Sequence, residues 1–253
     1  MSTTAPALEL DGVGLKIGGA RILEDVSFGV ARGEMVGVIG PNGAGKTTLF
    51  NTVSGLLRPT EGTVSMDGRP LGPLPIHRRA AAGLGRTFQT SSLFPGLSVV
   101  ENVRLAAQAR RGGSLSLLRF PRRGDAATAV AMDRLDEVGL TPLAGASAGG
   151  LSHGDKRKVE IAMLLATDPS VILLDEPMAG VGSADVPVLS AIIDRMHRET
   201  GRTILMVEHH MDVVLGLVDR VAVMHHGRLL AIDTPEAVMA DPTVQSAYLG
   251  EAV

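Results

Sequence analysis

The sequence has no cysteine and no tryptophan, and only 2% of its 253 residues are aromatic. The absence of cysteine excludes disulfides, thiol catalysis and cysteine-bound zinc, and it is compatible with a reducing compartment such as the cytosol. With so few aromatic side chains, stacking on nucleic-acid bases is not an expected mode of binding. The sequence therefore directs attention to polar and glycine-rich segments instead.

Charge and hydropathy narrow the classes further. The formal net charge is −3 and the sequence pI is about 6.2, so no overall attraction to nucleic acid or anionic lipid is expected. No apolar run approaches the roughly 18 residues that span a bilayer, and the first residues do not resemble a signal peptide. A membrane role would therefore have to go through partner subunits.

The hydrophobic pattern predicts an α/β fold. Short β-rich runs at residues 8–10 and 22–30 are expected to form antiparallel strands, and residues 63–68 another strand ending in a turn. Residues 104–108 and 126–138 have helical patterns. Later apolar runs of strand length at 171–174, 203–207 and 220–224 alternate with helical patterns, which is typical of a buried parallel sheet. Two short helices are expected after Thr234, the second from Pro242.

Residues 40–48 form the most informative motif, a glycine-rich loop between an apolar run and a helical pattern. In such a loop the backbone N–H groups and the helix N-terminus face the phosphates of a nucleoside triphosphate. The lysine would neutralise the β and γ oxygens, the first threonine would bind Mg²⁺, and the second would lie near the phosphates. The predicted phosphate-binding residues are Gly40, Pro41, Asn42, Gly43, Ala44, Gly45, Lys46, Thr47 and Thr48. Taken alone, this loop leaves kinase, GTPase and motor protein open.

Two carboxylates follow the apolar run at residues 171–174. Asp175 and Glu176 would lie at the C-terminal end of a buried strand, where open sheets bind ligands. Asp175 can hold Mg²⁺ directly or through water, and Glu176 can act as the general base that activates the attacking water.

A serine and a glycine stand at another predicted helix start, in Leu-Ser-His-Gly-Asp at residues 151–155. Ser152 and Gly154 are suited to meet a γ-phosphate at this helix N-terminus, although a serine there also serves as an ordinary N-cap. The spacing to Asp175 favours the phosphate-binding interpretation.

Taken together, these residues resemble the ATP-binding cassette (ABC) superfamily, and the resemblance covers nearly the whole chain. Members carry a phosphate loop, a glutamine loop, a Leu-Ser-x-Gly signature, a strand ending in Asp-Glu and a later histidine, and all of these are present in that order. The resemblance implies ATP and Mg²⁺ as cofactors. It assigns Gln89 to contact Mg²⁺ and His209 to contact the γ-phosphate. The signature serine would meet ATP held by a second cassette, so that two ATP molecules lie between two subunits.

Finer features resemble the branch that energises uptake of branched-chain or other amino acids, amides or urea. The telling segments are the signature histidine His153 and the tail at residues 234–252. This branch implies two permease subunits, a substrate-binding protein and a second ATPase, homo- or heteromeric, with the chain held at the inner face of the membrane. The arginine-rich insertion at residues 110–123 is either a solvated loop or a contact with permease or lipid.

The implied fold is a P-loop NTPase core with a mainly parallel sheet, an N-terminal antiparallel β subdomain and an inserted helical signature subdomain. One ABC ATPase domain is expected over residues 1–253, with the core at 1–88 and 170–253 and the helical subdomain at 89–169. Departures from the family pattern are Ile17 at the usual adenine-stacking aromatic, Gly182 at a usual acidic residue, His210 at a common aspartate and Asp155 at a common glutamine.

Other functions predict different features. A cassette for lipid or lipopolysaccharide export uses similar tail and loop sequences, and its permeases would distinguish it. Cassettes acting on DNA or the ribosome usually join two cassettes or carry long coiled insertions, which this chain does not have. A P-loop kinase or GTPase gives no explanation for the signature helix.

Overall fold

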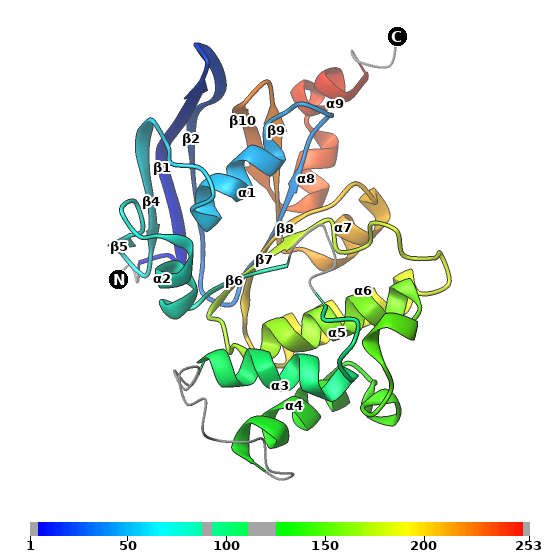
Figure 1. Cartoon of the computed structure of the whole chain (residues 1–253). Helices are drawn as coiled ribbons and strands as arrows, with labels where there is room; N and C mark the ends of the chain where they lie inside the picture. The colour runs from blue at the N-terminus through cyan, green and yellow to red at the C-terminus, as the bar shows by residue number, and fades with distance from the viewer. Residues whose placement is uncertain (1–4, 88–92, 111–124, 250–253) are drawn as a thin grey trace. The chain divides into compact units, whose positions relative to one another are not determined.

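The computed structural model describes residues 5–87, 93–110 and 125–249. The chain forms two compact units. We call the first the core unit (residues 1–84, 170–176 and 194–253) and the second the helical unit (residues 85–169 and 177–193). In Figure 1 the blue and cyan strands and the orange and red C-terminal elements belong to the core unit, and the green helices α3, α4 and α5 belong to the helical unit.

The core unit begins with a four-stranded antiparallel sheet of order β2-β1-β4-β5. Its strands are β1 (Leu8–Ile17), β2 (Ala20–Val30), β4 (Glu61–Met66) and β5 (Arg69–Pro70). The turn between β1 and β2 uses Gly18 and Gly19, whose φ angles of 56° and 86° suit glycine. The predicted antiparallel strands are confirmed.

The second sheet has the order β10-β9-β3-β8-β7-β6 and carries the glycine-rich loop, Asp175 and Glu176 at its strand ends. Its strands are β3 (Met35–Ile39), β6 (Leu84–Arg86), β7 (Val171–Asp175), β8 (Thr203–Val207), β9 (Arg220–His225) and β10 (Arg228–Asp233). β7, β8, β3 and β9 run parallel, and β10 pairs antiparallel with β9. Every residue of β3, β7 and β8 is buried, which explains why their sequences are mostly apolar.

The helices of the core unit are α1 (Lys46–Ser54), α2 (Ile76–Ala81), α7 (Met211–Leu217), α8 (Pro235–Ala240) and α9 (Pro242–Leu249). Phe50 and Val53 of α1 belong to a continuous apolar core that includes residues of both sheets. The two C-terminal helices begin as predicted, and the side chain of Thr234 caps α8 by accepting the N–H of Ala237.

The helical unit contains α3 (Val99–Arg110), α4 (Ala126–Glu137), the short 3₁₀ helices η1 (Thr141–Leu143) and η2 (Ala148–Gly150), and α5 (His153–Ala166). α3, α4 and α5 pack against one another. α6 (Val186–Arg198) starts in the helical unit and ends in the core unit. Most of the arginine-rich insertion, with Arg111, Arg119, Arg122 and Arg123, lies outside the described residues.

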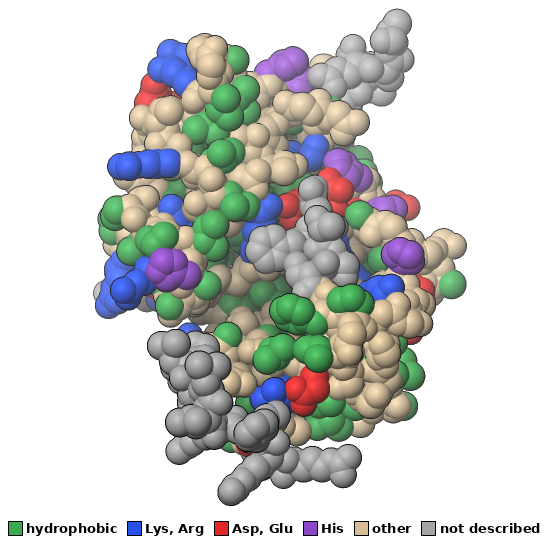
Figure 2. Space-filling model, viewed as in Figure 1, with side chains coloured by type: hydrophobic (Ala, Val, Ile, Leu, Met, Phe, Trp, Pro, Cys, Tyr) green, Lys and Arg blue, Asp and Glu red, His purple; other side chains and the backbone are tan. Residues whose placement is uncertain are grey.

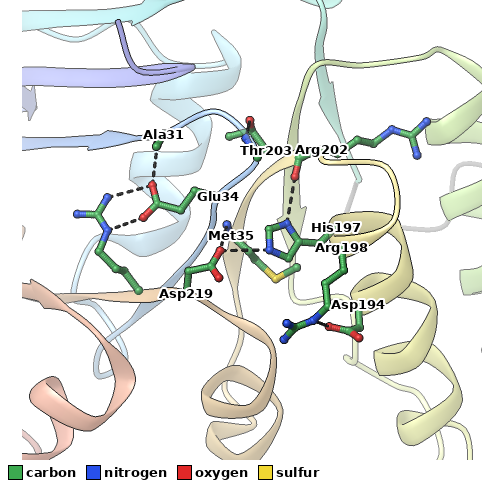
Figure 3. Close-up of polar contacts among 11 residues, drawn as sticks. Ala31, Glu34, Met35, Asp194, His197, Arg198, Arg202, Thr203 and Asp219 are labelled. Carbon is green, nitrogen blue, oxygen red and sulfur yellow. Dashed lines mark hydrogen bonds and ion pairs between the residues drawn. The ribbon is translucent and has the colours of Figure 1, made fainter. Parts of the chain in front are cut away.

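A polar network fastens the N-terminal ends of the parallel strands (Figure 3). The Asp219 carboxylate accepts the N–H of Met35 at 2.8 Å and lies 3.1 Å from Nε2 of the buried His197. Nearby, Glu34 pairs with Arg220 at 2.5 Å. Because Met35 begins β3 and Ile39 ends it, this network lies at the end of β3 away from the glycine-rich loop.

Candidate functional site

The glycine-rich loop lies between β3 and α1, as predicted. Gly43 and Gly45 have φ angles of 80° and 98°, in the left-handed region that glycine adopts without strain. Gly45 is the N-cap of α1, and no side chain caps the N-terminus of this helix. The first-turn N–H groups of α1 therefore lie at a helix N-terminus of the kind that binds anions.

Lys46 folds back onto this loop. Its ammonium donates to the carbonyl oxygens of Gly40 at 2.5 Å and Pro41 at 2.9 Å, and the residue is 6% exposed. Burial lowers the pKa of Lys46 below its ordinary value, while the nearby Glu176 carboxylate acts in the opposite direction. Phosphate oxygens can replace these carbonyl acceptors and would favour the charged form of Lys46.

The loop also rests on the turn between β9 and β10. The N–H of Gly227 donates to the carbonyl of Ala44 at 3.1 Å. On the other side of the loop, Asn42, Gly43 and Thr47 are exposed, while Pro41 and Thr48 are half-buried. Asn42, Gly43 and Thr47, three of the residues predicted to meet phosphate or metal, are thus accessible on a supported backbone.

Asp175 and Glu176 lie at the C-terminal end of β7, as predicted. Asp175 is fully buried, and Glu176 follows with a φ of 47°, an uncommon value for a residue with a side chain. The backbone N–H of Glu176 donates to the carbonyl of Val207 at 2.9 Å, so the end of β8 holds this conformation.

His209 is the second residue after β8, and its side chain contacts Glu176. Its Nε2 lies 2.7 Å from Oε1 of Glu176, and its side chain is 46% exposed. The structure therefore brings together two of the predicted site residues from neighbouring strands. A carboxylate beside an imidazole can accept a proton from water while the imidazole donates to a nearby oxygen.

Ser152 and Gly154 lie in the helical unit, at the start of α5. Ser152 is the N-cap of α5: its hydroxyl accepts the N–H of Asp155 at 3.1 Å and donates to that carboxylate at 2.9 Å. A Cβ on Gly154 would lie 2.6 Å from Oδ2 of Asp185, so a larger residue there would force the Asp185 side chain to move. The capping role of Ser152 is thus observed, and its contact with a nucleotide stays a prediction.

The remaining positions singled out in the sequence are Gln89, Ile17 and Gly182. Gln89 lies outside the described residues. Ile17 is 51% exposed at the end of β1, and Gly182 is exposed.

One residue was missed by the sequence interpretation, the buried Glu208, whose carboxylate accepts the N–H groups of His209 and His210. An acidic residue directly after the apolar run of β8, like Asp175 after the apolar run at residues 171–174, could have indicated it.

On the face shown in Figure 2, Lys and Arg side chains are scattered among acidic and apolar ones. This distribution agrees with the small net charge. In the ranges that the structure describes, none of the helices combines the length and the apolar character needed to cross a bilayer.

Comparison with known proteins adds the decisive observation. Residues 23–179 match the family model described as "ABC transporter", which is more than half of the chain. The chain belongs to the ABC transporter family. As an ATP-binding cassette it binds and hydrolyses ATP, and the fold expected from the sequence is confirmed. Residues 228–253 match a second model, described as "Branched-chain amino acid ATP-binding cassette transporter".

Individual relatives align with most or nearly all of this chain. The chain is 39% identical to the high-affinity branched-chain amino acid transport ATP-binding protein BraF of Pseudomonas aeruginosa, and the alignment covers 98% of this chain and 99% of BraF. A cassette of an ABC transporter solved in its ADP conformation has a TM-score of 0.84 and 28% identity, covering 98% and 100%. A dimeric post-hydrolysis cassette bound to ADP and Pi has a TM-score of 0.75 and 26% identity, covering 90% and 98%.

Proposed function

We propose that this cassette powers the uptake of branched-chain amino acids, or of related amino acids, amides or urea, through two membrane permease subunits fed by a substrate-binding protein. The observation that carries the proposal is the match of residues 228–253 to the branched-chain amino acid model, together with the named activity of BraF. The cassette itself holds no substrate specificity in this scheme, because selection belongs to the other subunits.

The test of this proposal is transport. The chain is co-expressed with candidate permeases and a candidate binding protein, chosen from neighbouring genes or from proteins that co-purify with it, and the complex is reconstituted in vesicles. ATP-dependent accumulation of labelled leucine is expected, with Lys46→Ala as the inactive control. Isolation of the chain with lipid-export permeases instead, or the absence of any permease partner, would contradict the proposal. Fractionation of the same cells should place the cassette at the inner face of the membrane only when the permeases are present.

Within the core unit, we propose that residues 40–48 hold the phosphates. Two observations support this: Asn42 and Gly43 of the loop are exposed, and the ammonium of the buried Lys46 contacts the carbonyl oxygens of Gly40 and Pro41. The core is assigned to residues 1–88 and 170–253 and the signature subdomain to 89–169, all within one ABC ATPase domain.

Mg²⁺ suits the oxygen donors at this site. Thr47 offers an exposed hydroxyl in the first turn of α1, and Asp175 offers a carboxylate at the end of β7. Mg²⁺ is typically bound by one or two such groups together with phosphate oxygens. Thr47, Asp175 and Gln89 are the proposed ligands, and when bound the ion would neutralise charge on the β and γ phosphate oxygens.

Glu176 is the proposed general base and His209 its partner. The 2.7 Å contact between them holds the Glu176 carboxylate in one orientation before ATP binds. In catalysis, Glu176 accepts a proton from the attacking water, and the exposed His209 ring donates to an oxygen of the γ-phosphate. Ser152 and Gly154 of a second cassette complete the site from the other side.

Glu176→Gln separates binding from chemistry. Because a glutamine keeps the size of the side chain but cannot accept the proton, ATP binding is expected within about threefold of wild type while kcat falls about 100-fold or more. Fluorescent-nucleotide binding and phosphate release measure the two quantities. The control is Glu61→Gln, which removes an exposed ion pair with Lys16 and should leave both unchanged. Near-normal turnover of Glu176→Gln would contradict the assignment.

A further inference from the structure

Glu208 is a buried acidic residue to which no role in the ATP site has yet been given. It follows β8 and is 2% exposed. Burying a carboxylate is costly unless hydrogen bonds compensate for the lost water. The contacts of Glu208 therefore indicate what its burial achieves.

Three contacts converge on one atom, Oε2 of Glu208. This oxygen accepts the backbone N–H of His209 at 2.7 Å and that of His210 at 3.2 Å. It also lies 3.1 Å from Nδ1 of His210, whose side chain is 55% exposed. A single carboxylate oxygen thus fixes the backbone of His209 and also contacts the ring of His210.

The residues held in this way reach directly to the proposed general base. Nε2 of His209 lies 2.7 Å from Oε1 of Glu176, and the N–H of Glu176 donates to the carbonyl of Val207 at 2.9 Å. The side chain and the backbone of Glu176 are therefore both held by the segment that ends β8. Because Glu176 has a φ of 47°, its position depends on such outside contacts.

We infer that Glu208 is a positioning residue for ATP hydrolysis: it fixes the backbone of His209 so that the His209 ring orients the Glu176 carboxylate. His210 completes the arrangement because its ring lies beside the Glu208 oxygen. The aspartate common at this position would place a second negative charge there instead. The inference rests on the roles proposed above for Glu176 and His209.

The first test compares Glu208→Ala with Glu208→Gln in steady-state ATP hydrolysis. Alanine removes the acceptor, and kcat is expected to fall about 10- to 100-fold while KM for ATP stays within about twofold, because the phosphate loop is untouched. Glutamine keeps one carbonyl oxygen for the same N–H groups and should stay within about threefold of wild type. Equal losses in both variants, or a loss expressed only in KM, would overturn the inference.

A double-mutant cycle distinguishes positioning from a general loss of structure. If Glu208 acts through His209, adding Glu208→Ala to His209→Ala should lower kcat no further. Multiplied losses would overturn the inference. Retention of wild-type kcat by His209→Ala alone would instead refute the proposed role of His209, so the two failures are distinguishable.

His210→Ala keeps the test informative if Glu208→Ala does not fold. It removes only an exposed ring, so the urea midpoint should be unchanged while kcat falls about two- to fivefold with KM constant. An unchanged kcat in His210→Ala, in an assay where His209→Ala is impaired, would overturn the inference, whereas His209→Ala near wild type in the same assay would refute the proposed role of His209. An unchanged kcat in a foldable Glu208→Ala variant would overturn the inference about Glu208.

Discussion

Gly40 and Gly43 belong to the same loop, but a side chain would meet different surroundings at each. A Cβ on Gly40, where φ is 149°, would lie 2.1 Å from the carbonyl oxygen of Met224 in β9. A Cβ on Gly43, where φ is 80°, would have no atom within 4 Å. The first glycine is therefore required by the fold and the second leaves space on the side where a phosphate would bind.

Alanine at these two positions should separate stability from binding. Gly40→Ala is expected to cost about 3 kcal/mol or more of unfolding free energy, since β9 must move. Gly43→Ala should cost only about 1 kcal/mol, from its positive φ, but should weaken ATP binding about tenfold or more by obstructing the approach of phosphate. Urea unfolding and nucleotide titration give the two values. Similar unfolding midpoints for both variants would contradict this prediction.

The helix of the phosphate loop depends on a residue from another helix. Arg79 of α2 is 2% exposed, and its guanidinium donates to the carbonyls of Thr52 at 3.0 Å and Val53 at 2.7 Å in the last turn of α1. It also donates to the carbonyl of Leu74 at 3.0 Å. Burial lowers the pKa of Arg79 from its ordinary value. This side chain satisfies carbonyl groups that a helix C-terminus leaves without partners in the helix.

Arg79→Met should therefore destabilise the core unit. The aliphatic length is kept while the hydrogen bonds to backbone carbonyls are lost, so a cost of about 2–4 kcal/mol is expected. Arg78→Met, at an exposed position in the same helix, serves as the control and should stay within about 0.5 kcal/mol of wild type. Chemical denaturation followed by circular dichroism measures both. Equal stabilities of the two variants would show that the cap contributes nothing.

Elements with a strong local pattern could be predicted, and those held by distant partners could not. The apolar runs of β7 and β8 identified buried parallel strands because every residue in them is covered. The start of α5 was predicted within residues 151–155, and the helix begins at His153 with the Ser152 hydroxyl as its cap. β5 and β6 are too short for any periodicity to appear.

The same limit applies to the site. Asp175 and Glu176 were predicted because a strand end is visible in the sequence. Their contact with His209 depends on β7 and β8 lying side by side, which no local pattern specifies. Glu208 was missed for the same reason. Its hydrogen-bond partners His209 and His210 are adjacent in sequence, but its proposed role depends on β8 bringing His209 beside Glu176.

At the scale of the whole molecule, the proposed site is shared between two chains, and mixing inactive variants tests this. Lys46→Ala lacks a working phosphate loop but keeps its signature, and Ser152→Arg keeps the loop but blocks the signature. Each alone should be inactive. Their equal mixture should recover roughly a quarter of wild-type ATPase activity, because about half of randomly formed dimers are mixed and each has one intact site.

The first control is a chain that carries both Lys46→Ala and Ser152→Arg, whose ATPase activity should stay at background. The second control is wild type diluted to the same concentration. Recovery confirms a dimer of identical chains. No recovery from two folded variants would contradict pairing between copies of this chain and would direct the search to a second, related cassette.

The sheet order has a consequence for how the protein is made. The strand that leads into the phosphate loop, β3, emerges early in synthesis, but its two neighbours are β8 and β9, whose residues begin at Thr203 and Arg220. The antiparallel sheet can close within a nascent chain of the first 70 residues. β3, which has no exposed residue in the finished protein, must wait until most of the chain has left the ribosome. A chain interrupted before β8 would carry an intact glycine-rich sequence but an uncovered apolar strand β3. We expect such a chain neither to bind ATP nor to stay soluble.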